Sequence, residues 1–210
     1  MKRMKKTMTL LVIFIMVSLA LPVSAQAQSR KAAVNKTVNT FFANAGKLNS
    51  KKMNKCFVSK GVLIFDAPAG LRKELRPYSK NLSWKIKSTR ITGNKAKVRV
   101  RVKYRSLSKA YLATLFTVVE SEEGSKKDSV YLMWLKKYAQ EAFRKFVKQF
   151  PPDEVTANLS ISLQKKNGKW KITEAEDRLF NVIYCDLLLQ GKSQEAYEKE
   201  GEDIEEKLNN

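Results

Sequence analysis

Residues 82–105 read LSWKIKSTRITGNKAKVRVRVKYR, and this stretch decides the fold. Apolar and cationic side chains alternate on both sides of Gly93-Asn94, as they do in two antiparallel strands that each have one buried and one solvated face. An uninterrupted hairpin with a two-residue loop would set Trp84 opposite a lysine and mix the two faces. A three-residue loop or a β-bulge instead sets Trp84 opposite Val102, so we predict that register.

One face of this predicted hairpin carries a stripe of cations. Alternate side chains of a strand stand about 6.6–6.8 Å apart on one face, and over residues 95–105 every such position is a lysine or an arginine. The register sets Ile86 opposite Val100, and it brings like charges opposite each other in the two strands, which is destabilising. Lys85 is expected to face Arg101, and Lys87 to face Arg99. The candidate anion-binding residues are Lys85, Lys87, Lys97, Arg99, Arg101, Lys103 and Arg105, with Lys171 of a later hairpin extending the patch.

Three interpretations of this cationic face are open. It is a solvated outer face that keeps the protein soluble, a face that the acidic tail at residues 191–210 covers, or a surface that binds an anion. Nucleic acid is the less favoured anion, because no aromatic side chain interleaves with the cations for base stacking. The partners that we expect are an anionic polymer of the cell envelope, a lipid surface or an acidic protein. The oligomeric state is open.

The residues before the hairpin are predicted to be mainly helical. An apolar stripe at helical spacing runs over residues 34–45 and stops at Gly46. A shorter helix is expected to follow, with Ser50 as its N-cap. The apolar run at residues 62–65 predicts a short buried strand, and the spacing of apolar residues over 71–78 predicts further helical turns.

After the hairpin the hydrophobic period becomes helical and then returns to that of a strand. Residues 107–150 carry two helical stripes, and Pro151-Pro152 ends the second. Alternation resumes over residues 157–163. These segments predict an α+β fold: N-terminal helices packed on an antiparallel sheet, with a two-helix insertion between the second and third long strands and a short C-terminal helix.

A second hairpin is predicted near the C-terminal end of the domain. Asn167-Gly168 is the residue pair of a type I′ turn, and a two-residue loop there sets Leu163 opposite Ile172. Thr173 and Glu176 have the spacing of a capping box, which predicts that the last helix of the domain begins there.

The first 27 residues have the composition of a secretory signal peptide. Four cations precede an apolar stretch over about residues 8–21, and Ala25-Gln26-Ala27 is a suitable cleavage site. An uncleaved anchor helix is the alternative. We therefore expect a secreted, extracytoplasmic protein with no transmembrane helix after cleavage, a single domain over residues 28–190, and an acidic tail over 191–210 that is a frayed helix or disordered.

Composition excludes several kinds of chemistry. The 210 residues include 41 lysines and arginines, 20 aspartates and glutamates and no histidine, so the formal net charge is +21. Without histidine there is no Ser-His-Asp or Cys-His nucleophile, no His-ligated zinc and no imidazole acid–base catalysis. Two cysteines cannot hold an iron–sulfur cluster. We expect no cofactor and no metal.

The order of these segments resembles the nuclear-transport-factor-2-like superfamily, and more narrowly the exported proteins of Gram-positive bacteria that carry this cone-shaped fold. The residues that carry the likeness are the Phe41-Phe42-x-Ala stretch, the strand from Val98 to Tyr104, the helical pair, the hairpin from Asn167 to Ile172, and Asp177 before an apolar helix. The resemblance covers about residues 33–190. It implies that the antiparallel sheet is curved and cone-like, and that the protein is either a small-molecule enzyme or a binding module. Many such relatives are lipoproteins, but this chain has no anchoring Cys after the apolar stretch.

Enzymes of this fold place an acid and a phenol or imidazole inside the cone, so the resemblance makes Trp84, Tyr104, Asp66 and Asp177 the pocket candidates. Asp66 follows an apolar run, and a raised pKa would suit it to act as a general base. The alternative is that Asp66 starts a turn, that Asp177 lies in the first turn of a helix, and that the aromatic side chains pack in the core.

Two other patterns carry weaker suggestions. Ser106-Leu107-Ser108-Lys109 fits the S-x-x-K pattern of penicillin-interacting enzymes, but the S-D-N and K-T-G partners are missing, and a serine that caps the next helix is the simpler interpretation. Cys56 and Cys185 could form a disulfide in an oxidising compartment; the alternative is two buried apolar side chains.

These observations favour an exported, non-enzymatic module that contacts an anionic envelope component or a protein partner through its cationic face. A small-molecule binder or enzyme that uses the interior of the cone is the alternative. It requires a cavity lined by Trp84, Tyr104 and an acid.

Overall fold

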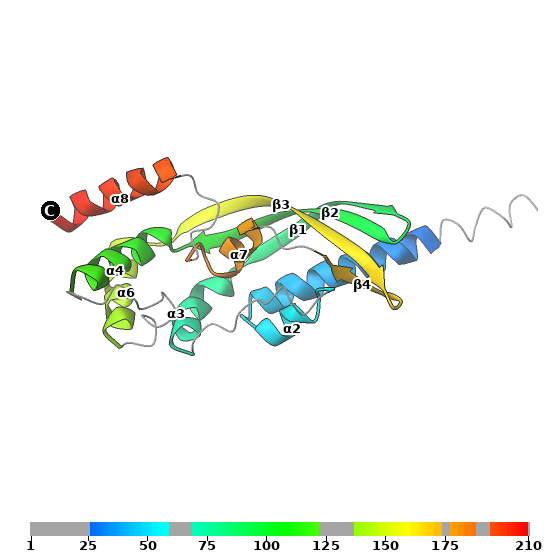
Figure 1. Ribbon diagram of the computed structural model, residues 1–210, viewed down its shortest axis with the longest axis horizontal. Helices are drawn as coiled ribbons and strands as arrows, with labels where there is room; N and C mark the ends of the chain where they lie inside the picture. The colour runs from blue at the N-terminus through cyan, green and yellow to red at the C-terminus, as the bar shows by residue number, and fades with distance from the viewer. Residues whose placement is uncertain (1–25, 59–68, 122–136, 174–176, 188–193, 210) are drawn as a thin grey trace, which may run out of the picture.

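The computed structural model (Figure 1) describes residues 26–58, 69–121, 137–173, 177–187 and 194–209 of the protein, and its fold class is α+β as predicted. The elements in chain order are an N-terminal helix over 26–45, α2 (Ser50–Asn54), α3 (Ala69–Ser79), β1 (Ser83–Thr92), β2 (Lys95–Ser106), α4 (Ser108–Ser121), α6 (Lys137–Gln149), β3 (Asp153–Lys166), β4 (Lys169–Ile172), α7 (Asp177–Ile183) and α8 (Gln194–Asn209).

The four strands form one open antiparallel sheet in the order β1-β2-β3-β4. The predicted register of the first hairpin is confirmed, because Trp84 lies opposite Val102 and Ile86 opposite Val100. The loop has only two residues, and a bulge between Ile86 and Ser88 restores the separation of the two faces. This bulge corrects one expected pair: Ser88, and not Lys87, lies opposite Arg99.

The core lies on one side of the sheet, between the strands and the N-terminal helix (Figure 1). Alternate side chains of β2 are buried, and Val98 at its centre has no exposed surface. The helix contributes Phe41 and Phe42, and the Phe42 ring stacks on Trp84 with 5.7 Å between the ring centroids. The predicted apolar stripes therefore form a single packed layer beneath the strands.

The second hairpin has the predicted geometry. Asn167 and Gly168 both have positive φ angles, +50° and +76°, as a type I′ turn requires, and Leu163 lies opposite Ile172. The backbone of Ile172 also bonds to residues 56–58 on its other side, where its N–H donates to the Cys56 carbonyl at 2.8 Å. The hairpin thus joins the sheet to the segment that follows α2.

The helices α4, α6 and α8 gather at the opposite end of the sheet (Figure 1). In the chain, α4 and α6 lie between β2 and β3, together with residues 122–136, which are outside the described part; the two-helix insertion therefore stays a prediction. The helix α8 lies in the acidic tail, and its Ile204 side chain is fully buried. Its Lys207 carbonyl accepts a hydrogen bond from Gln149 of α6 at 3.2 Å.

Several local predictions are corrected or lie outside the described residues. The N-cap of α2 is Asn49, whose side chain accepts a hydrogen bond from the Lys52 N–H, and Ser50 is the first helical residue. The Thr173 hydroxyl donates to the Ser162 carbonyl. Residues 1–25 of the expected signal peptide, the expected strand at 62–65 and Glu176 of the expected capping box lie outside the described residues. In the ranges that the structure does describe, no helix has the length and apolarity needed to cross a membrane.

The two faces of the sheet predict different costs of mutation. Leu163 is only 2% exposed and packs between β2 and β4, so Leu163→Ala is expected to lower the free energy of unfolding by about 2–5 kcal/mol. The neighbouring exposed residue gives the control: Gln164→Ala is expected to change the free energy of unfolding by less than about 0.5 kcal/mol. Urea unfolding of both variants measures the difference, and equal losses would contradict the assignment of the faces.

Candidate functional site

The exposed face of β2 carries an unbroken row of cations, as predicted. Strand alternation turns the valines of β2 into the core, and the residues between them therefore point to solvent. Arg105, at the end of the row, is half-buried. We call the exposed residues the β2 cation row; they are Lys95, Lys97, Arg99, Arg101 and Lys103.

The strand β1 widens this row at two positions. Lys85 lies opposite Arg101, as predicted, and Arg90 lies opposite Lys97. Arg90 was missed by sequence reasoning, because without the bulge its position falls on the core side of the strand. Lys87 lies at the bulge and is exposed, so it remains on the edge of the cationic face without a partner position in β2.

The strand β3 lines the other side of the cation row with uncharged polar residues. Each member of the β2 cation row has one of these residues as its cross-strand partner, and sequence reasoning did not identify them as part of a site. The alternation of polar and apolar residues over 156–164 was the available signal. We call them the β3 polar row; they are Thr156, Asn158, Ser160, Ser162 and Gln164.

Among the described residues, a carboxylate pairs with the cationic face only at one end of that face. Lys103 pairs with Glu154 at 3.2 Å, and both side chains are about half exposed, so the pair contributes little stability. Farther along β2, no carboxylate of the described part of the chain pairs with Lys97, Arg99 or Arg101. The middle of the row is therefore an uncompensated line of positive charge.

The opposite end of the face is hollowed. Here the surface forms an open depression of about 590 Å³, with cations on one side and hydroxyl and amide groups on the other. Its polar lining residues are Arg90, Thr92, Lys95, Lys97, Ser162, Gln164 and Thr173. Cations and hydrogen-bond donors that converge on a depression are suited to hold an anionic group such as a phosphate.

The acidic tail does not lie along the β2 cation row in the described residues. Its helix α8 lies beyond the end of the sheet and packs on α4 (Figure 1). Gly201 of α8 approaches the Phe116 ring of α4, and Lys207 lies over the Phe150 ring at 5.7 Å. This placement disfavours the interpretation in which the tail covers the cationic face.

A second cationic hollow lies away from the sheet face. It is formed between the residues that precede and begin α2 and the first turns of α3, and it also measures about 590 Å³. Its cationic lining residues are Lys47, Lys51, Arg72, Lys73 and Arg76. This hollow is one competitor for an anion that binds the protein.

Of the pocket candidates, Trp84 and Tyr104 occupy neighbouring positions on the core side of the sheet, but their polar groups are bonded to different partners. Trp84 stacks on the core and donates its indole N–H to Asn39 at 2.9 Å, whereas the Tyr104 hydroxyl donates to Asp186 at 2.9 Å. Asp177 begins α7, and Asp66 lies outside the described residues. Neither Trp84 nor Tyr104 lines the two hollows described above.

Asp186 is the acid that sequence reasoning missed. It is buried in a tight turn in which Cys185 and Asp186 both have positive φ angles, +54° and +64°. The Cys185 carbonyl accepts a hydrogen bond from the Leu107 N–H at 2.8 Å, which fixes the turn against the end of β2. Burial raises the pKa of Tyr104, and the negative charge of Asp186 raises it further. A single acid within the apolar run over residues 182–189 was the available signal.

Replacing the phenol of Tyr104 tests how much its hydrogen bond to Asp186 stabilises the fold. Tyr104→Phe removes the hydrogen bond to Asp186 and is expected to cost about 1–3 kcal/mol of unfolding free energy at pH 7. Because the folded pKa of Tyr104 exceeds the unfolded value of about 10, its contribution is complete below pH 10 and declines as the pH rises further. The unfolding free energy of Tyr104→Phe should therefore fall less steeply above pH 10 than that of the wild type. If the unfolding free energies of the two proteins fall equally steeply above pH 10, the raised pKa of Tyr104 is contradicted.

The disulfide hypothesis for Cys56 and Cys185 is wrong in this structure, since both are buried free thiols. The Cys56 backbone bonds to Ile172 of β4, and the Cys185 backbone bonds to Leu107 just after β2. Most of the 12-residue length of β2 separates these two places, a span on the order of 30 Å. A disulfide needs Cα atoms within about 7 Å. Both side chains are instead apolar parts of the core.

A thiol count tests this correction. Burial raises the pKa of Cys185 to about 12, and burial also raises that of Cys56, although Lys171 partly opposes the shift. We expect both thiols to react slowly with a thiol reagent in the folded protein and rapidly after unfolding without reductant. Absence of free thiols in the unfolded, unreduced protein would show that the cysteines had paired.

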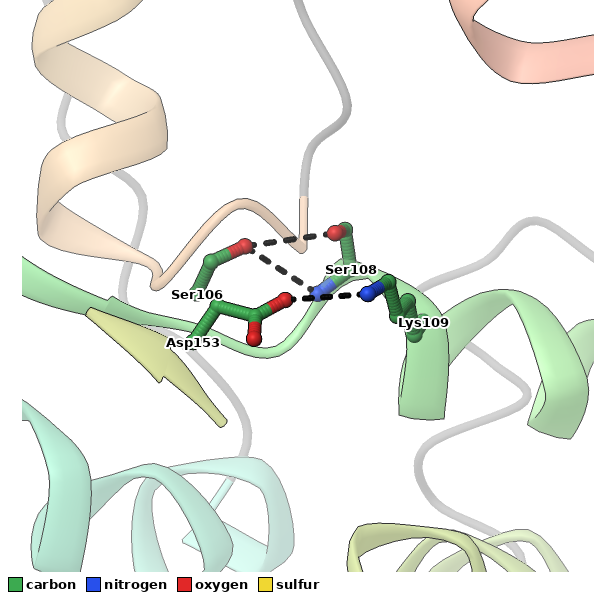
Figure 2. A network of polar contacts seen from close by, with 4 residues as sticks. All are labelled: Ser106, Ser108, Lys109 and Asp153. Atoms are coloured by element: carbon green, nitrogen blue, oxygen red, sulfur yellow. Dashed lines mark hydrogen bonds and ion pairs between the residues drawn. The ribbon is translucent and has the colours of Figure 1, made fainter. Parts of the chain in front are cut away.

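The S-x-x-K segment does not have the geometry of a serine nucleophile with its base (Figure 2). The Lys109 ammonium pairs with the exposed Asp153 at 3.2 Å. The Ser106 and Ser108 hydroxyls lie 3.2 Å apart, and the Ser106 hydroxyl also accepts from the Ser108 N–H. These contacts lie where the end of β2 leads into the start of α4.

Within the described residues, no three Asp, Glu or Cys side chains come together as the ligands of a metal ion would. Comparison of the sequence with models of protein families and with curated proteins finds no match.

Proposed function

We propose that the protein is an exported, non-enzymatic module that binds a linear anionic polymer of the cell envelope along its β2 cation row. The observation that carries the proposal is the uncompensated middle of this row, at Lys97, Arg99 and Arg101. Like charges lie opposite each other where Lys85 faces Arg101 and Arg90 faces Lys97. Such pairs are destabilising, and binding an extended polyanion would offset this repulsion.

The arrangement of charge suits a polymer better than a single small anion. The cations follow one strand in a line, so an extended polyanion can contact several of them at once. Each exposed contact contributes little by itself in salt solution, but contacts along one chain add through the high effective concentration of the tethered groups. Such binding is expected to weaken strongly as salt screens the charges.

Export is part of this proposal. It is supported by the four cations, the apolar stretch and Ala25-Gln26-Ala27 at the start of the chain. Membership of the nuclear-transport-factor-2-like superfamily is likewise proposed, supported by the order of N-terminal helix, long hairpin, helices and second hairpin. The non-enzymatic assignment is supported by the bonds that occupy both polar groups: the Trp84 indole N–H donates to Asn39, and the Tyr104 hydroxyl donates to Asp186.

Binding to purified cell wall tests the proposal, with the variant Lys97→Glu/Arg99→Glu/Arg101→Glu. We expect the wild type to sediment with the wall at about 50 mM salt and much less at about 300 mM salt. The variant is expected to bind at least about ten-fold more weakly at low salt.

The matched control places the same charge change in the second cationic hollow, as Lys47→Glu/Lys51→Glu/Lys73→Glu. All three of these side chains are exposed, and they lie near α2 and α3 instead of on the sheet face. We expect this variant to keep most of the affinity. Binding that resists both salt and reversal of the β2 cations would overturn the proposal, whereas loss of binding only in the control would move the site to the second hollow.

A further inference from the structure

The β2 cation row and the β3 polar row form a two-row surface with a common repeat. Each cation has its own uncharged partner directly opposite on the same face, from Lys95 with Gln164 to Lys103 with Thr156. Adjacent strands lie about 4.7–4.9 Å apart, and members of each row follow one another at about 6.6–6.8 Å. The face thus offers a charge and a hydrogen-bonding group at every repeat, side by side.

From this surface we infer the chemical class of the polymer: a linear phosphodiester whose repeating unit is a short, hydroxylated carbon chain. The inference rests on the proposed function, since it names the ligand of the same face. Phosphates are expected to follow the β2 cation row, and the hydroxyl groups between them to contact the β3 polar row.

The repeat distance supports this class. Two residues of a strand contain six backbone bonds, and two extended residues span at most about 6.6–7.2 Å. A phosphodiester of a three-carbon polyol also has six backbone bonds from one phosphorus to the next, so its extended repeat has a similar length. Successive phosphates can therefore meet successive cations without a change of register over the five members of the row. Inorganic polyphosphate, with two bonds per repeat, does not match this spacing.

The β3 polar row is suited to contact the hydroxyl groups of such a polymer. Its members carry hydroxyls and amides, which can both donate to and accept from a polyol hydroxyl. At the centre of the row, opposite Arg99, the Ser160 hydroxyl oxygen is buried and has no hydrogen-bond partner in the described part of the chain. A buried hydroxyl usually has a partner. Water does not reach this oxygen in the unbound protein, so a ligand hydroxyl would supply the partner only after the side chains that cover the oxygen move aside.

Single-stranded nucleic acid has the same six-bond repeat, so spacing alone does not exclude it. Its bases are commonly held by stacking on aromatic side chains. In the two rows there is no aromatic residue, and Trp84 and Tyr104 of the neighbouring positions pack on the core side of the sheet. The surface therefore fits hydroxyls better than bases.

Three synthetic five-unit oligomers test the inference, with affinity measured by calorimetry at low salt. One is poly(glycerol phosphate), one is poly(propane-1,3-diol phosphate), which keeps the spacing but lacks the hydroxyl, and one is oligothymidylate. We expect the glycerol oligomer to bind at least about five-fold more tightly than either of the others, the difference of about one net hydrogen bond. A two-unit glycerol oligomer is expected to bind more weakly than the five-unit one, because it reaches fewer cations.

Two variants test which residues contact the hydroxyl groups and which contact the phosphates. Ser160→Ala is expected to reduce the preference for the glycerol oligomer and to leave the propanediol oligomer unaffected; it breaks no described hydrogen bond, so the fold should tolerate it. Arg99→Gln is expected to weaken both oligomers alike, because it removes a charge that both contact.

Equal binding of the glycerol and propanediol oligomers, or a Ser160→Ala variant that leaves their ratio unchanged, would overturn the hydroxyl contact while the polyanion-binding function stands. Tighter binding of oligothymidylate would overturn it in favour of nucleic acid. Binding of none of the three oligomers, together with unaltered wall binding by the β2 charge-reversal variant, would overturn the proposed function as well.

Discussion

The structure depends on the alternation of β2. Its buried valines form the roof of the core over the N-terminal helix, and a strand that buries every second side chain must expose the others. In this chain the exposed positions are all cationic. The strand that organises the core therefore also carries the repulsion between like charges. Neighbouring strands can reduce this repulsion only through the side chains that they place beside the cations. β3 places uncharged polar groups there, and Glu154 is the acid that reaches Lys103.

The fold could be predicted largely because hydrophobic period and turn chemistry agree in most of the described segments. Trp84, Ile86 and the valines of β2 fix the register of the first hairpin, and Asn167-Gly168 fixes that of the second. The place of the bulge could not be predicted, because several positions between Ile86 and Thr92 would separate the faces equally well. That one-residue ambiguity is why the expected opposition of Lys87 and Arg99 was wrong and why Arg90 was missed.

The candidate site was predicted only in part, because it depends on contacts between segments that are distant in the chain. A cation row on one strand is visible in the sequence, but the residues beside it come from β3, separated in the chain by α4 and α6. The β2–β3 register that sets Ser160 against Arg99 follows from packing of the complete sheet. The link from Tyr104 to Asp186 likewise depends on a turn after α7 that closes on the end of β2. The sequence marks Ser160 by the alternation of its strand and Asp186 as a single acid in an apolar run, but it does not indicate which residue either of them contacts.

The central claim is that the β2 cation row and the β3 polar row bind one extended polyanion. Nuclear magnetic resonance of the labelled protein, titrated with the five-unit glycerol phosphate oligomer, tests it most directly because it locates the contact. We expect the largest shift changes at the Arg99 and Arg101 guanidinium groups and at the amides of Asn158 and Ser160, with little change near the second cationic hollow. Shift changes centred on Lys51 and Arg76, with the β2 and β3 signals unmoved, would contradict it.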